Sequence, residues 1–400
     1  MKRKWICGID LGSGKIAGVV GRLEGSAVTL FGAAAVESSG IARGVVTDLG
    51  SVSSAVRELV DQLESQSKFR LETALLAFNG AHLECQNFQS SDFITERARE
   101  ITSREVRHVL GQAQTVSFPM NRQLLHVLLQ GYVVDGQGGI QNPIGMYAAR
   151  LRVQLLSLTG IQTFIQNAVT CVNRAGLDVE ALVFSGYATA LAVLGRENRR
   201  GGCAFLEIGD GLSSFLVFQG GGVTHLQVFP FGGELVTESI AEQFQISKRD
   251  AKLLKEQQGT LLLPETAASH ELLIGDGSRQ KVIRKGELCE VIQRATQRLF
   301  EDIRKGTKDL PFPNNTLVLS GGGSLLEGMA DSAGEYLKCH ASVGSIQELS
   351  FRKPLPPSFA TAVGLLRYGA EKQKEQRLLL PEGPVGRVLL RLRELFFDYF

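Results

Sequence analysis

The feature that most constrains the fold is a strand–turn–strand unit that occurs twice. The stretch "WICGIDLGSGKIAGVVGRL" is typical of an apolar strand that ends at Leu11, a tight turn, and a second apolar strand from Ile16. The stretch "GGCAFLEIGDGLSSFLVFQGGG" repeats this plan, with Gly209-Asp210-Gly211 as the turn and a strand over 214–218. Each turn would expose backbone N–H groups and small hydroxyls, which suit a phosphate held between two such loops. One glycine turn would be an ordinary hairpin, but two copies in two halves of the chain favour a phosphate site.

Two better-known phosphate motifs do not fit the first turn. Gly12, Gly14 and Ala17 satisfy G-x-G-x-x-A, but a dinucleotide fingerprint requires a helix next, and "IAGVVGRL" is β-branched and strand-like. A P-loop requires Ser or Thr after its lysine, whereas Ile16 follows Lys15 here. Neither class is therefore predicted.

A third glycine element follows a buried strand in "TLVLSGGGSLLEGMADSAGEYL". Gly321, Gly322, Gly323 and Ser324 are expected to lead into the N-terminus of an amphipathic helix. Unpaired N–H groups there favour an anion, and glycines let a flat ring or a phosphate approach closely. Taken alone, the element is explained equally well as a tight strand–helix turn.

Composition excludes several functional classes. A length of 400 residues predicts two or more domains, and a net charge of +2 gives no electrostatic case for nucleic-acid binding. The six cysteines form no CxxC pair and the six histidines no HExxH spacing, so buried thiols in a reducing cytoplasm are expected rather than disulfides or a zinc site. No apolar run reaches the roughly 18 residues of a membrane span. Asp10 and Lys15 interrupt the apolar stretch that a signal peptide would need.

In their order along the chain, the three glycine elements resemble the phosphate-1, phosphate-2 and adenosine motifs of the actin/Hsp70/hexokinase superfamily. Further segments narrow the resemblance: "GIARGVVTDLGSVSSAVRELVDQLE", "ALLAFNGAHLECQN", "GGGVTHLQVFPFGGELVTESIAEQF" and "ATAVGLLRYG" follow in order the pattern of the FtsA family of bacterial cell-division proteins. The similarity runs over nearly the whole chain. It implies an α/β, actin-like (ribonuclease H-like) fold with two lobes, in which an insert called 1C replaces the second subdomain of actin.

The resemblance also implies a division of the chain into units. These are subdomain 1A at 1–80 and 160–200, insert 1C at 81–159, subdomain 2A at 201–240 and 308–370, subdomain 2B (the nucleotide lid) at 241–307, a linker at 371–384, and a membrane-binding amphipathic helix at 385–400. Within the insert, Thr102 and Glu105 have the spacing of a capping box at a helix start. Within subdomain 2B, two helices are expected to flank a hairpin.

By the same resemblance, the glycine elements would bind ATP and Mg²⁺. Asp10 would hold the Mg²⁺ shell through water, and Lys15 would face β- and γ-phosphate oxygens. An aspartate that ends an apolar strand needs a partner in any case. The predicted nucleotide-binding residues are Asp10, Gly12, Ser13, Gly14, Lys15, Gly209, Gly211, Ser213, Gly232, Gly233, Glu234, Lys255, Gly321, Gly322 and Gly323.

The second turn departs from the superfamily pattern D-x-G-G-G-T-x-D. Glu207 replaces its first aspartate, Asp210 replaces a glycine, and Ser214 replaces its last acid. A carboxylate at Asp210 would repel phosphates unless it points away or helps to coordinate metal. Ser185 stands where hydrolytic relatives have an acid or amide that positions water, and a serine is a poor base. Nucleotide is therefore expected to act as a conformational ligand, with at most weak ATPase activity and no catalytic residue assigned.

Two other functions remain open for the same fold. One is a hydrolytic ATPase or sugar kinase, although no convincing catalytic aspartate for a sugar is present. The other is an assembly scaffold of the pilus type, such as PilM, which would not be expected to carry the apolar C-terminal segment.

The chain ends in "PVGRVLLRLRELFFDYF" after the polar run "AEKQKEQRLLLPEGP". At about 100° per residue, the segment 385–400 has an apolar stripe opposite charged residues. Proteins of the FtsA family end on a tether and a membrane-binding helix, so the resemblance implies the same here, with insertion resting mainly on apolar burial. The predicted membrane-binding residues are Val388, Leu389, Leu392, Leu395, Phe396, Tyr399, Arg387 and Arg391.

The resemblance finally implies a role as an adaptor. The protein would form filaments, tie the tubulin-like FtsZ to the cytoplasmic face of the bacterial inner membrane at the division site, and help recruit later division proteins through insert 1C. The FtsZ C-terminal tail would bind subdomain 2B. Because that tail is expected to be acidic, Arg294, Arg298 and Arg304 are the candidate contacts. No nucleic-acid partner is expected.

Overall fold

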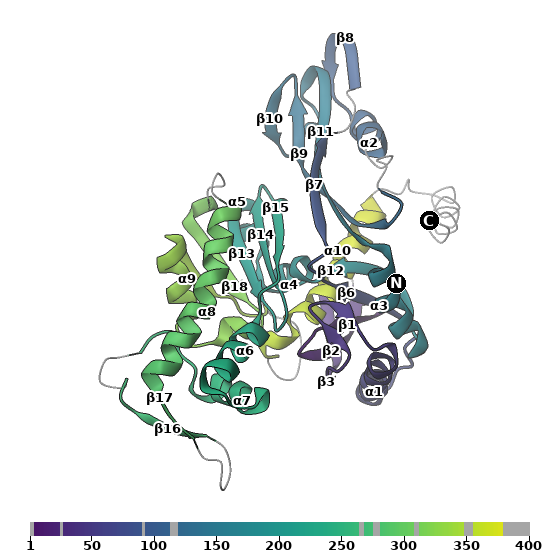
Figure 1. Cartoon of the computed structure of the whole chain (residues 1–400). Helices are drawn as coiled ribbons and strands as arrows, with labels where there is room; N and C mark the ends of the chain where they lie inside the picture. Colours follow the sequence, from purple (N-terminus) through teal and green to yellow (C-terminus); the bar gives the residue numbers. More distant parts are fainter. Residues whose placement is uncertain are drawn as a thin grey trace.

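Two five-stranded sheets of the same topology form two lobes (Figure 1). In each sheet, three antiparallel strands are joined to two parallel ones. The first sheet has the order β3 (Ala27–Glu37), β2 (Lys15–Glu24), β1 (Lys4–Leu11), β6 (Thr73–Phe78), β12 (Asp178–Phe184). The second has the order β15 (Gly222–Phe229), β14 (Ser213–Gln219), β13 (Cys203–Ile208), β18 (Thr316–Ser320), β19 (His340–Val343). The computed structural model describes residues 4–24, 27–89, 93–112, 119–263, 268–274, 281–307, 312–347 and 355–378.

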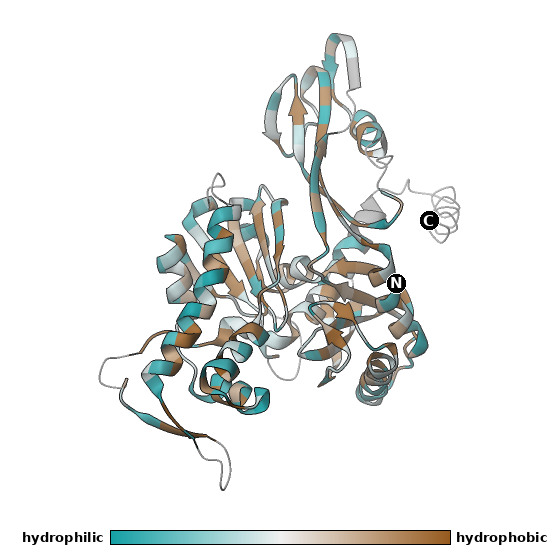
Figure 2. Cartoon of the chain, in the orientation of Figure 1, coloured by the Kyte–Doolittle hydropathy of each residue, from teal (hydrophilic) through white to brown (hydrophobic). Residues whose placement is uncertain are grey.

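The central strands are buried on both faces. Every residue of β13 is buried, as is all of β14 except Gln219. Helices cover both faces of such a sheet, which favours continuous apolar runs over alternating ones. Figure 2 shows this pattern, with hydrophobic residues concentrated on the strands and hydrophilic residues on the outer helices.

Two helices pack against each other between the sheets, α4 (Ser185–Val193) and α10 (Ala360–Leu378). α10 contacts β1, β2 and β6, while α4 also contacts β13 and β14 of the other sheet. Their backbones approach so closely that a Cβ on Gly364 would lie 1.7 Å from the carbonyl oxygen of Ala188. One core cluster therefore joins both lobes, with Leu75 from the first sheet and Phe205 from the second.

The outer faces are covered by longer helices. α1 (Leu49–Ser67) and α3 (Gln162–Arg174) pack on the first sheet, and the Asp48 carboxylate caps α1 by accepting from the amides of Gly50 and Ser51. The core of the second lobe includes α6 (Gly233–Phe244), α8 (Lys285–Gly306) and α9 (Met329–Leu337), and α7 (Lys248–Gln258) packs against α6. Shorter elements are β4 (Ile41–Ala42), β5 (Val45–Val46), α5 (Arg196–Gly201) and the 3-10 helix η4 (Pro313–Asn315).

A third sheet extends from the first lobe (Figure 1). Its order is β10 (Gln137–Ile140), β9 (Arg122–Val134), β11 (Tyr147–Ile161), β7 (Glu84–Gln89), and β8 (Phe93–Glu100) also pairs with β11. The predicted capping box is confirmed at α2 (Ser103–Gln112). The Glu105 carboxylate accepts from the backbone N–H of Thr102 at 3.0 Å and from its hydroxyl.

One arginine joins the three strands at the base of this sheet. The guanidinium of Arg122 donates to the hydroxyl and the carbonyl of Thr159, to the carboxylate of Glu84, and to the carbonyl of His82, at 2.9–3.0 Å. Its side chain is only 10% exposed. Charge-assisted hydrogen bonds therefore hold the strands together at the base of the third sheet.

The hairpin predicted between two helices is present. β16 (Glu271–Ile274) pairs with β17 (Lys281–Arg284), and the hairpin lies between α7 and α8 in the chain. Its role as a nucleotide lid stays a prediction. Among the helices of the described residues, none is both long and apolar enough to cross a bilayer, and the predicted membrane helix at 385–400 lies outside those residues.

The only tryptophan of the chain lies on the first sheet. The ring of Trp5 stacks on Phe69 with centroids 4.5 Å apart, and meets Phe31 edge-on at 4.9 Å. The three rings form an aromatic cluster in which β1, β3 and the end of α1 meet.

Candidate nucleotide-binding site

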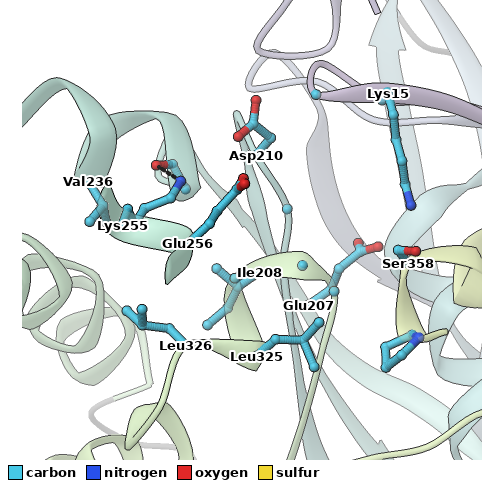
Figure 3. Close-up of a pocket in the computed structure, with 18 of the residues that line it drawn as sticks. Lys15, Glu207, Ile208, Asp210, Val236, Lys255, Glu256, Leu325, Leu326 and Ser358 are labelled. Carbon is cyan, nitrogen blue, oxygen red and sulfur yellow. Dashed lines mark hydrogen bonds between the residues drawn. The ribbon is translucent and has the colours of Figure 1, made fainter. Parts of the chain in front are cut away.

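A cleft of about 690 Å³ lies where the two glycine turns meet α7 and α10 (Figure 3). Its volume is in the range typical of small-molecule sites. Most of the predicted nucleotide residues line it, namely Asp10, Gly12, Ser13, Gly14, Lys15, Gly209, Gly233, Lys255, Gly321, Gly322 and Gly323.

The two turns face each other across a short gap. A Cβ on Gly14 would lie 3.0 Å from Cγ of Asp210, and a Cβ on Gly211 would lie 2.9 Å from Oγ of Ser13. A side chain at either position would press against the opposite turn, so glycine allows the close approach. The structure therefore brings the two predicted turns together, and their role in phosphate binding stays a prediction.

Four predicted residues, Gly211, Ser213, Gly232 and Glu234, are not part of the cleft lining. The hydroxyl of Ser213 donates to the carbonyl of Phe231 at 2.8 Å. The amide of Glu234 donates to the Asp210 carbonyl at 2.8 Å, and that of Gly233 to the Gly209 carbonyl at 2.9 Å. These hydrogen bonds stabilise the second turn. Two amides at the start of α6 are therefore already bonded within the protein.

Two carboxylates from different lobes lie on the floor of the cleft. Asp10 comes from β1 and Glu207 from β13. Burial raises the pKa of Asp10 to about 7, helped by the charge of Glu207 and opposed by Lys15 and a hydrogen bond from Thr361. Burial also raises the pKa of Glu207, and hydroxyl groups beginning with that of Thr189 oppose the shift.

The floor of the cleft offers a carboxylate oxygen that could bind a cation. Oε1 of Glu207 accepts from the Thr189 hydroxyl at 2.7 Å and from the Thr361 hydroxyl at 3.3 Å. Its Oε2 is buried and has no hydrogen-bond partner among the described residues. A buried carboxylate oxygen without a partner is costly unless it is protonated or binds a cation, so the residues fit Mg²⁺. Within the described ranges no cluster of three or more His, Cys, Asp or Glu side chains could hold a metal, so phosphate or water would have to supply further ligands.

Lys15 is the predicted cation of the phosphate site. It is the first residue of β2, and Figure 3 shows its side chain extending across the cleft toward Ser358. Burial lowers the pKa of its ammonium group, and the charge of Asp10 opposes that shift. The ammonium therefore lies near Ser358, on the side of the cleft away from Asp210 (Figure 3).

The opposite side of the cleft carries Asp210, Lys255 and Glu256 (Figure 3). Lys255 Nζ donates to the Gly233 carbonyl at 2.8 Å. Burial lowers the pKa of Lys255, and the charges of Asp210 and Glu256 oppose this. The charge of Lys255 would offset the repulsion of phosphate that is expected from Asp210, because the two side chains lie near each other.

The third glycine element differs from its sequence-based expectation. The glycines lead into a 3-10 helix, η5 (Gly322–Leu325), and α9 begins only at Met329. Gly321 has a φ of +85°, and a Cβ there would lie 2.4 Å from the Ile208 carbonyl oxygen. The left-handed turn ends the strand sharply, and it leaves an apolar wall of Leu325, Leu326, Ile208, Val236 and Met329.

Sequence reasoning missed part of the lining, notably Thr189, Lys252, Glu256, Pro357, Ser358 and Thr361. A polar Thr361 in the apolar start of α10 was the available signal, but its partner Glu207 is distant in sequence. Ser185 is buried and does not line the cleft. Arg294, Arg298 and Arg304 are exposed on α8.

Comparisons with known proteins match separate parts of this chain and also most of its length. Residues 80–159 match the model "SHS2 domain inserted in FTSA", and residues 204–364 match "Cell division protein FtsA". The cell division protein FtsA of Escherichia coli (strain K12) is 31% identical over 386 residues, which is 92% of this chain and 91% of that protein. Among solved structures, a PilM-PilN type IV pilus biogenesis complex has a TM-score of 0.63 at 17% identity, covering 91% of this chain and 98% of the other. MreB5 of Spiroplasma citri bound to ADP has a TM-score of 0.54 at 11% identity, covering 94% and 99%.

These similarities confirm the predicted actin-like fold with an inserted domain in the first half. The pilus and MreB5 structures are too distant in sequence to indicate more than a shared fold. The matches in sequence are specific and cover most of the chain. The chain belongs to the FtsA family of cell-division proteins.

Proposed function

We propose that this protein is a nucleotide-controlled adaptor of bacterial cell division. It binds ATP with Mg²⁺ in the cleft, forms filaments, and links FtsZ to the cytoplasmic face of the membrane at the division site. It also helps to recruit later division proteins through the inserted SHS2-type domain. Family membership supports the division role, and the cleft supports the nucleotide.

The observation that carries the nucleotide site is the meeting of the two glycine turns beside Lys15. Exposed turn amides and an ammonium group bind phosphate oxygens. On the other side, Asp210 and Glu256 provide acceptors for sugar hydroxyls, and the wall at Leu325 offers an apolar surface for a base. Solved structures of MreB5, which share the fold, contain ADP or AMPPNP.

Asp10 and Glu207 would hold the Mg²⁺ shell. Bound Mg²⁺ would neutralise phosphate charge at that place. The charge repulsion between the two carboxylates, which helps to raise the pKa of Asp10, would then be relieved.

Slow hydrolysis is part of the proposal. Ser185 stands where hydrolytic relatives have a water-positioning acid or amide, and it is 6% exposed and outside the cleft lining. A neutral hydroxyl is a poor general base. The nucleotide therefore acts as a conformational ligand, which suits a structural adaptor better than a kinase.

The first test is calorimetric titration with Mg·ATP. Lys15→Ala and Asp10→Ala should each weaken binding by at least about tenfold, because hydrogen bonds to charged groups contribute about 1.5–3 kcal/mol. Lys305→Ala is the matched control, because it removes an equal charge from a lysine that is 75% exposed on α8. Equal affinities of the wild type and both cleft variants would refute this nucleotide site.

A further inference from the structure

An aromatic ring lies beside the ammonium group of Lys15. The Nζ atom is 5.1 Å from the centroid of the Phe359 ring. Phe359 ends the 3-10 helix η6 (Pro357–Phe359), which directly precedes α10 and packs against β2. Pro357 and Ser358 of η6 line the cleft, whereas Phe359 stands behind them.

The backbone that carries this ring is restricted on both sides. Pro356 and Pro357 restrict the chain on the N-terminal side. The amide of Phe359 donates to the Pro356 carbonyl at 2.9 Å. On the C-terminal side Ala360, the first residue of α10, is only 1% exposed. The ring therefore has only its two side-chain torsions free, while the Lys15 stem has four rotatable bonds.

The ring offers Lys15 a contact other than an ion pair with Asp10. The charges of Lys15 and Asp10 influence each other across the cleft floor. A direct ion pair between them would neutralise the cation needed for phosphate and the carboxylate needed for metal. The face of an aromatic ring attracts an ammonium group through its quadrupole but carries no net charge. It can hold the lysine while leaving its charge available.

We infer that Phe359 is a positioning residue for nucleotide binding, whose ring holds the Lys15 ammonium toward the phosphates and apart from Asp10. The inference rests on the proposed function of the cleft. It adds a residue that acts on the ligand only through Lys15.

A double-mutant cycle on the full chain tests this coupling. Mg·ATP affinity is measured by calorimetry for the wild type, Phe359→Leu, Lys15→Met and the double variant, with melting temperatures alongside. Phe359→Leu should weaken binding roughly three- to tenfold, as expected for a partly buried cation–π contact. The double variant should bind no more weakly than Lys15→Met alone, because the ring has no cation left to hold. Phe359→Tyr keeps the ring face and should keep the wild-type affinity.

The outcomes separate the inference from the proposed function. If Lys15→Met weakens binding but the two losses simply add, or if Phe359→Tyr binds as weakly as Phe359→Leu, the positioning role is wrong and the nucleotide site stands. If the folded wild type does not bind Mg·ATP, the proposed function itself fails. Should Phe359→Leu not fold, Phe359→Met fills the same space without a ring and gives the same comparison.

Discussion

His126 and Asp10 are buried ionisable side chains with opposite pH dependences. Burial lowers the pKa of His126 to about 4, and the charge of Lys372 adds to the effect. Its neutral Nε2 accepts a hydrogen bond from the Phe184 amide at 2.8 Å. Asp10 has its pKa raised to about 7. Folding therefore favours the neutral form of both groups, and acidification below neutral pH weakens the fold at His126 and strengthens it at Asp10.

The contribution of His126 can be measured by unfolding. An unfolded histidine binds a proton as the pH falls below its ordinary value of 6.5, while the folded one does not until about pH 4. The stability due to His126 is thus present above pH 6.5 and is lost as the pH falls toward 4. Between pH 7.5 and 5 the loss should be about 2 kcal/mol. Urea unfolding of the wild type and of His126→Gln, which retains an acceptor, should show this difference in slope, and parallel pH profiles would contradict it.

Single residues of the cleft could be predicted only where the neighbouring sequence indicated a site. Asp10 lies near the end of one apolar strand and Lys15 at the start of the next, where a charge has no local reason to be. Thr361 and Glu256 lie in helices whose own sequence does not reveal that they line a cleft. Their role depends on strands and turns far away along the chain, as the hydrogen bond from Thr361 to Glu207 illustrates.

At the scale of the elements, one arginine joins three strands of the inserted sheet. Arg122 joins β7, β9 and β11 at the base of that sheet through four hydrogen bonds. Three of their acceptors, two on Thr159 and the carbonyl of His82, belong to partly buried contacts. Removal of the guanidinium would leave these acceptors without their donor, which costs more than an ordinary hydrogen bond.

Arg122→Met should therefore destabilise the protein by about 2–4 kcal/mol, since several buried acceptors lose their partner. Limited proteolysis should then cut the strands at the base of the insert faster than in the wild type. Lys248→Met serves as the control, because its ion pair with Glu238 is exposed and such pairs contribute about 0–1 kcal/mol. Equal unfolding midpoints for the two variants would show that the arginine does not hold the insert.

Elements with strong periodicity or capping signals were predictable, whereas the conformation of the glycine run at 321–323 was not. The capping box at Thr102 and the hairpin between α7 and α8 follow from local signals. The turn at Gly321 was expected to open a helix directly, but it forms η5 first. Glycine can adopt many backbone conformations. A run of glycines therefore does not indicate which conformation forms beside Ile208.

On the scale of the whole molecule, the proposed adaptor requires a membrane anchor beyond α10. The stripe that includes Phe396 lies outside the described residues, so its role rests on the sequence pattern and the family. Burial of a Leu or Phe side chain contributes about 1.5–3 kcal/mol. An anchor of this kind, with few net charges, depends mainly on such burial.

Phe396→Glu should reduce liposome co-sedimentation at least about tenfold, since it removes that burial and adds a carboxylate at the lipid boundary. Arg391→Glu is the comparison on the polar face, and should weaken binding less and mainly on anionic lipid. Nucleotide affinity should stay unchanged in both. A lower melting temperature with intact lipid binding for Phe396→Glu would place the segment in the protein core instead.

The aromatic cluster on β1 has a spectroscopic consequence. Since Trp5 is the chain's only tryptophan and stacks on Phe69, intrinsic fluorescence excited near its absorption band comes from one corner of one lobe. A change in this emission therefore reports the unfolding of the first sheet, and it does not report unfolding of the insert or of the second lobe. Circular dichroism averages over all of them. Where the two signals give different midpoints, the lobes unfold in separate steps, and a single free energy of unfolding does not describe the chain.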